Sequence, residues 1–131
     1  MIQDSRRTKK IKEFTDLITW QEGHKLVIQI YQSTKHFPKE EKFSLSDQIQ
    51  RAAVSVTSNI AEGFGRQTLK EKVQFYYLAQ GSLTEVKNQL LIARDVGYLS
   101  VNTFSALFAQ SNTTHQLLQG LIAKTKLLSR P

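Results

Sequence analysis

The sequence predicts an all-α protein, an antiparallel up-down-up-down four-helix bundle. Apolar residues recur at three- and four-residue steps in four segments, and no segment shows the alternation of a strand. The connections are short, which favours antiparallel neighbours. The four helices are expected at about residues 19–36, 45–63, 68–96 and 101–128 of the 131-residue chain.

The first two helices are defined by apolar stripes and turn residues. In the first, Thr19 is the expected N-cap and Phe37-Pro38 the end, since the residue before proline leaves the helical region. The second starts near Ser44 with a motif like a capping box. Gly63 and Gly65 are expected to cap its end with positive φ angles. The apolar stripes are Trp20, Gly23, His24, Val27, Ile30, Tyr31 and Thr34, then Leu45, Ile49, Ala52, Ala53, Val56 and Ile60.

The third and fourth helices have clearer boundaries. Thr68 and Glu71 form a capping box, Gly97 is the expected C′ residue, and the fourth helix begins around Ser100 or Asn102. The third helix carries two adjoining stripes, which predict either a subunit interface or one wide stripe within a monomer. They are Val73, Tyr76, Leu83 and Leu90, and Phe75, Leu78, Ala79, Val86 and Ala93; the fourth helix has Phe104, Leu107, Phe108, Ser111, His115, Leu118, Leu121, Ile122 and Leu128.

Length and composition indicate one domain, with a basic N-terminal arm at 1–15 and the bundle at 16–131. The absence of cysteine excludes disulfides and thiolate metal sites and fits a cytoplasmic location. No signal peptide and no membrane span are expected, because no long apolar stretch occurs.

The net charge of +7 is concentrated in the tails. Residues 1–14 and 124–131 each carry a net +3, whereas 15–123 carry ten basic and nine acidic residues. An antiparallel bundle brings both tails to one end, so an RNA or DNA partner is expected there; solubility is the alternative explanation of the charge. The candidate nucleic-acid-binding residues are Arg6, Arg7, Lys9, Lys10, Lys12, Lys124, Lys126 and Arg130.

The sequence offers no catalytic constellation. His24, His36 and His115 lack a glutamate three residues earlier, which excludes the Glu-x-x-His pairs of di-iron bundles. His24 and His115 are expected to be packing residues with hydrogen bonds. GFGR at 63–66 lacks the spacing of a phosphate-binding loop, and no serine has a recognisable base partner. We expect no enzyme activity, no metal, no cofactor and no small-molecule substrate.

Small polar residues occupy one side of the second helix. At 100° per residue, Ser55, Ser58 and Glu62 lie opposite the apolar stripe and Asn59 lies at its boundary. Short side chains favour a helix–helix or subunit contact; plain surface and a ligand or nucleic-acid site are the alternatives. Gly81-Ser82 and Glu85 supply a counterpart on the third helix. The candidate assembly and polar network is Arg51, Ser55, Asn59, Glu62, Arg66, Ser82 and Glu85.

Three blocks also carry a family resemblance: DLITWQEGHKL, IYQSTKHFPKEEKFSLSDQIQRAAVSVTSNIAEGFGR and FYYLAQGSLTEVKNQLLIARDVGYL. The chain resembles, over about residues 16–99, the four-helix bundle proteins encoded in intervening sequences of bacterial large-subunit (23S) ribosomal RNA genes. It departs from them at Gly23, where the family often has alanine, and at Thr57, where it often has proline.

The resemblance implies a left-handed bundle, a ring-shaped homopentamer and no established enzymatic activity. It also implies kinship with the accessory proteins of diversity-generating retroelements, whose basic pentamers bind nucleic acid. The expected function is therefore that of a self-associating, non-enzymatic protein that binds RNA or DNA through basic surfaces. The alternative is a structural or adaptor protein that binds another protein and no nucleic acid.

Overall fold

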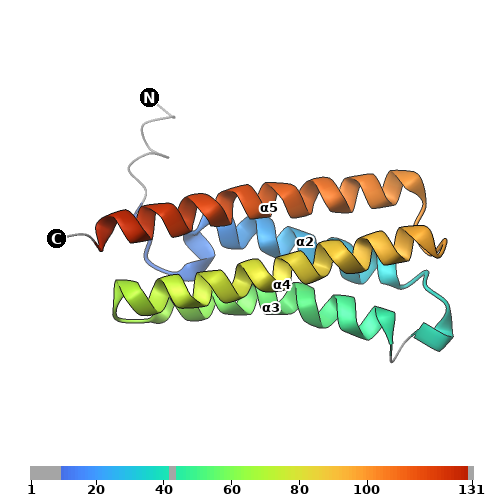
Figure 1. The fold of residues 1–131 in the computed structure, drawn as a ribbon, viewed down its shortest axis with the longest axis horizontal. Coiled ribbons are helices and arrows are strands. Elements are labelled where there is room, and N and C mark those ends of the chain that lie inside the picture. Colours follow the sequence, from blue (N-terminus) through green and yellow to red (C-terminus); the bar gives the residue numbers. More distant parts are fainter. Residues whose placement is uncertain (1–9, 42–43, 130–131) are drawn as a thin grey trace.

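The chain folds into four α-helices that lie side by side along one long axis (Figure 1). A computed structural model describes residues 10–41 and 44–129. The helices are α2 (Ile18–Thr34), α3 (Leu45–Gly65), α4 (Leu69–Asp95) and α5 (Val101–Leu128), with short 3-10 helices η1 (Phe14–Asp16) and η2 (Lys39–Glu41). The predicted helix boundaries are confirmed to within two residues.

Successive helices run in opposite directions, as Figure 1 shows. α2 and α4 each contact α3 and α5, which gives a four-cornered bundle. The start of α2 lies against the C-terminal half of α5, where the Thr19 hydroxyl donates to the Leu117 carbonyl at 3.4 Å. The start of α2, the α3–α4 turn and the end of α5 therefore share one end of the bundle.

The apolar stripes fill the space between the four helices. On α4 both predicted stripes are buried within the single chain, since Leu83 and Leu90 and also Ala79, Val86 and Ala93 have almost no exposed surface. Most of the apolar residues of α4 are thus covered by the other helices of the same chain. Leu78, however, is 56% exposed, so it does not belong to the core of the single chain. Leu128, predicted on the buried stripe of α5, is 64% exposed, so that core position is wrong. Leu26, which the predicted α2 stripe omits, is fully buried.

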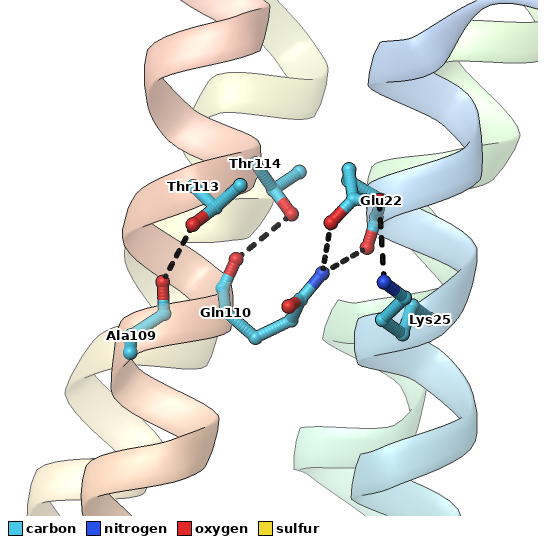
Figure 2. Close-up of polar contacts among 6 residues, drawn as sticks. All are labelled: Glu22, Lys25, Ala109, Gln110, Thr113 and Thr114. Atoms are coloured by element: carbon cyan, nitrogen blue, oxygen red, sulfur yellow. Dashed lines mark hydrogen bonds and ion pairs between the residues drawn. The ribbon is translucent and has the colours of Figure 1, made fainter.

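Small side chains let α2 approach α3 and α5 closely. A Cβ at Gly23 would lie 3.2 Å from Thr57 Cγ2 and 3.6 Å from Thr114 Cγ2. One helical turn along α5, Gln110 Nε2 donates to the Glu22 carbonyl at 2.9 Å and to Glu22 Oε1 at 3.0 Å, and Lys25 pairs with the same carboxylate (Figure 2). The charges of Glu22 and Lys25 on α2 therefore balance each other at this contact with α5.

The buried face of α5 contains hydroxyl groups, which must find partners away from water. Ser111 donates to the Leu107 carbonyl, Thr114 to the Gln110 carbonyl and Thr125 to the Leu121 carbonyl, each one turn back. Each hydroxyl is therefore satisfied inside its own helix, and a polar sequence can form a core face.

The helix ends confirm some predicted caps and contradict others. Thr68 and Ser100 accept the backbone N–H groups of Glu71 and Thr103, and Gly97 has φ +84° after α4. Thr19 is not a cap, because α2 begins one residue earlier and Thr19 is buried inside it. Ser44 precedes α3, but its side chain forms no capping bond; the Glu41 carboxylate accepts from Leu45 N instead.

The predicted glycine cap of α3 is wrong. Gly63 and Gly65 both lie inside α3, and among the described residues only Gly97 has a positive φ. Gly63 has a packing role, since a Cβ there would lie 2.7 Å from Tyr76 Cε1 and 3.0 Å from Phe75 Cβ. The missing side chain lets α3 and α4 approach each other near their connecting turn.

Candidate functional site

One end of the bundle collects most of the basic residues. This basic end comprises the start of α2, the α3–α4 turn and the end of α5. Its described basic residues are Lys10, Lys12, Arg66, Lys70, Lys72, Lys124 and Lys126, and its acidic residues are Glu13, Asp16, Glu62 and Glu71, a net of +3. At the opposite end the described residues include four basic side chains (Lys35, Lys39, Arg51 and Arg94) and four acidic ones (Glu40, Glu41, Asp47 and Asp95).

Half of the candidate nucleic-acid-binding residues belong to this end. Lys10, Lys12, Lys124 and Lys126 are all exposed there. The candidates Arg6, Arg7, Lys9 and Arg130 lie outside the described residues.

Some basic side chains at this end form hydrogen bonds or ion pairs with the described residues, and others form none. Lys126 Nζ donates to the Tyr77 hydroxyl at 2.8 Å, Lys72 Nζ donates to the Phe64 carbonyl, and Arg66 pairs with Glu62 at 3.0 Å. Lys70 and Lys124 form no hydrogen bond or ion pair with the described residues. These two lysines can therefore meet an anion without first losing a partner.

Lys70 and Lys72 are additions that the tail-centred interpretation of the sequence missed. They follow the α3–α4 turn, more than fifty residues from either tail in sequence. The signal was available, because in an up-down-up-down bundle the second connection lies at the same end as both termini.

The structure brings together three members of the predicted polar network, between α3 and α4. Ser55 Oγ and Ser82 Oγ are 2.8 Å apart across the two helices. Asn59 Nδ2 donates to Ser55 Oγ at 3.0 Å and to the Ser55 carbonyl at 2.8 Å. The small residues thus form a partly buried polar contact between two helices of one chain.

The remaining four members lie apart from this contact. Arg51 pairs with Asp47 at 2.9 Å on the surface of α3. Arg66 pairs with Glu62 and places its guanidinium carbon 4.5 Å from the centre of the Phe75 ring. Glu85 is exposed on α4 and pairs with none of the described residues.

A lysine and a histidine form an unusual pair between α4 and α5. Lys87 Nζ lies 2.8 Å from His115 Nδ1, and both residues are half-buried. Burial lowers the pKa of Lys87; burial and the neighbouring Lys87 charge together lower the pKa of His115. With a neutral imidazole, Lys87 Nζ donates a hydrogen bond to His115 Nδ1, which confirms His115 as a packing residue with a hydrogen bond.

The described residues form neither a metal-binding cluster nor a membrane-spanning helix. They contain no group of three histidine or carboxylate side chains that could hold a metal ion. His24, predicted on the apolar stripe, is instead exposed and stacks on Trp20 with ring centres 4.7 Å apart. None of the described helices is both long and apolar enough to cross a bilayer.

The sequence matches one family model, that of the 23S rRNA-intervening sequence proteins, over residues 15–120. The chain belongs to this family. The match extends past the three quoted sequence blocks into α5.

A solved structure supports the fold of this family member. It is the crystal structure of a protein of unknown function from the S23 ribosomal protein family of Bacteroides thetaiotaomicron. The two structures superpose with a TM-score of 0.75 at 19% identity, over 80% of this chain and 98% of that chain. No curated protein matches the sequence.

Proposed function

We propose that this family member is a non-enzymatic, self-associating cytoplasmic protein whose basic end binds RNA or DNA. The observation that carries the proposal is the uneven charge of the described residues: they give a net +3 at the basic end, against four basic and four acidic residues at the other end. Exposed lysines on a rigid bundle suit contacts to phosphates, which are strongly salt-dependent and weakly sequence-specific.

Self-association is supported by the outward face of α4. Leu78, Glu85 and Ile92 follow one another at seven-residue steps and so share one face. Leu78 and Ile92 are 56% and 43% exposed. We propose that this face meets another copy in a ring-shaped homopentamer, the assembly that the family resemblance implies. Five copies at +7 each would carry +35.

Binding is tested by fluorescence anisotropy with a labelled, structured RNA at two salt concentrations. The test variant replaces Lys10, Lys12, Lys70 and Lys124 with glutamine, and a second variant lacks residues 1–9 and 130–131. We expect both to bind more weakly, and the salt slope to fall by about 0.7–0.9 for each phosphate that the variant no longer neutralises.

A matched control removes the same charge elsewhere, at Lys25, Lys35, Lys39 and Arg51. All four side chains are exposed and lie away from the basic end. If the control loses as much affinity as the test variants, binding does not belong to the basic end. If the wild-type chain binds no RNA or DNA at either salt concentration, the alternative of an adaptor for another protein takes precedence.

Self-association is tested separately by light scattering of the purified chain. A solution mass about five times the 15.0 kDa of one chain is expected. A monomeric mass at micromolar concentration would remove the pentamer and the charge summation together.

A further inference from the structure

Three cationic side chains lie along the contact between α4 and α5, and each lies next to an aromatic ring. Lys126 Nζ lies 5.3 Å from the centre of the Tyr77 ring, Lys87 contacts the His115 imidazole, and the Arg94 guanidinium carbon lies 4.8 Å from the centre of the Phe104 ring. We call these six residues the α4–α5 strip. From Tyr77 to Arg94 it extends along α4 for about 25 Å.

The strip has few carboxylates near it. The chain contains no acidic residue after Asp95, so α5 contributes none. On α4, Glu71 and Glu85 each lie about 160° around the helix from Lys87, at 100° per residue. Asp95 is the exception, since it pairs with Arg94 at 2.8 Å. Lys87 and Lys126 therefore keep their charge without an anionic partner among the described residues.

The Lys87–His115 pair indicates a local shortage of negative charge. The pair joins the two helices in a half-buried site, and the charge of Lys87 opposes protonation of His115. An anion that approached this point would favour both protonated side chains. A phosphate bound at this site would therefore interact favourably with both side chains.

The Tyr77 ring is exposed enough to stack on a nucleic-acid base. Tyr77 is 44% exposed, and its hydroxyl is already bonded to Lys126, which holds the ring in place. Cationic grooves with exposed aromatic rings are typical of proteins that bind single strands, because every base has a stacking face. A duplex would keep its bases stacked inside and could not use the ring.

We propose that a single-stranded nucleic acid follows the α4–α5 strip, with phosphates at Lys126, Lys87 and Arg94 and a base stacked on Tyr77. The strip begins at the basic end, with which it shares Lys126. The inference rests on the proposed function and assigns to it a strand type and a path.

The first test uses the three histidines of the chain as probes. Their titration is followed by NMR with and without an oligothymidylate of about ten nucleotides. The pKa of His115 should rise on binding, whereas the ring signals of His24 and His36, outside the strip, should not move when the oligonucleotide is added. An unchanged His115 in the saturated complex would overturn the proposed path.

The second test compares two double variants that each remove two positive charges, and then two variants of Tyr77. Lys87→Gln with Arg94→Gln should lower the salt slope for the oligonucleotide by about 0.7 per phosphate contact. The control, Lys25→Gln with Arg51→Gln, removes the same charge from α2 and α3 and should leave the slope closer to that of the wild type. Tyr77→Leu should weaken binding about fivefold or more, while Tyr77→Phe, which keeps the ring, should not.

The outcomes separate the two proposals. If the wild type binds the oligonucleotide and the strip variants behave like the control, the path is wrong and the nucleic-acid function stands. Binding of structured RNA without binding of the oligonucleotide leads to the same conclusion. Binding of neither overturns the proposed function and the strip with it. Circular dichroism of each variant confirms that the bundle is folded.

Discussion

At position 63 the bundle has no room for a side chain. A Cβ there would lie 2.7 Å and 2.9 Å from two carbons of the Tyr76 ring, which is itself buried in the core. Gly63→Ala should therefore destabilise the fold by about 1–3 kcal/mol, because overpacking outweighs the better helix propensity of alanine. Urea denaturation followed by circular dichroism measures the change.

The control is Gly120→Ala on α5, where nothing lies within 4 Å of the added carbon. This change should stabilise the chain by about 0.5–1 kcal/mol through helix propensity alone. If the two substitutions shifted stability in the same direction, the close approach of α3 and α4 at Gly63 would be wrong.

Asn59 is the member of the polar network with two bonds to one neighbour. Asn59→Leu removes both donations to Ser55 and leaves its hydroxyl to Ser82 alone. We expect a loss of about 1 kcal/mol in unfolding free energy, with no change in RNA affinity. The exposed Ser58→Ala should change stability by less than about 0.5 kcal/mol. A loss of affinity without a loss of stability would favour the ligand-site alternative for this face.

Between elements, the contact of α4 with α5 should make stability depend on pH. The pKa of His115 in the folded chain lies below its ordinary value of 6.5. In the window between the two values the unfolded chain binds more protons, so the unfolding free energy rises with pH there. Stability should therefore be lost as the pH falls through about 6.5, and the loss is complete below the folded pKa.

Thermal unfolding between about pH 5.5 and 7.5 follows this effect, since histidine is the side chain that ordinarily titrates there. In His115→Gln the part of the slope due to this residue should disappear. His36→Gln serves as the control, because His36 is exposed near the end of α2 and its side chain forms no hydrogen bond with the described residues. Equal slopes in the wild type and both variants would contradict a lowered His115 pKa in the folded chain.

The helices themselves could be predicted from the sequence, because each has a stripe of apolar residues and most have a recognisable end. Their exact first residues and caps could not be predicted. Thr19 and Ser44 have the chemistry of caps, but tertiary contacts decide where α2 begins and which side chain caps the start of α3. The prediction for Gly63 was wrong for a similar reason. A glycine near a helix end has the same signature whether it turns the chain or admits a neighbouring ring.

For the molecule as a whole, topology was the most useful prediction. It predicts that both tails lie at one end, and the same topology places the α3–α4 turn, with Lys70 and Lys72, at that end too. The Lys87–His115 pair and the bond of 2.9 Å from the Tyr98 hydroxyl to Glu41 could not be foreseen, because they join residues 28 and 57 positions apart. Such contacts depend on helix rotation, which periodicity determines only to within a broad face.

The last prediction concerns the link between assembly and binding. Leu78→Asn with Ile92→Asn alters two exposed side chains without changing net charge, so stability should change little. If copies meet through this face of α4, light scattering should show monomers. A monomer brings +7 to a nucleic acid instead of +35, and neighbouring basic ends no longer act at high effective concentration. RNA affinity should then fall at least tenfold, with a smaller salt slope. Monomers that keep the wild-type affinity would show that one basic end suffices, and unchanged oligomers would move the interface to another face.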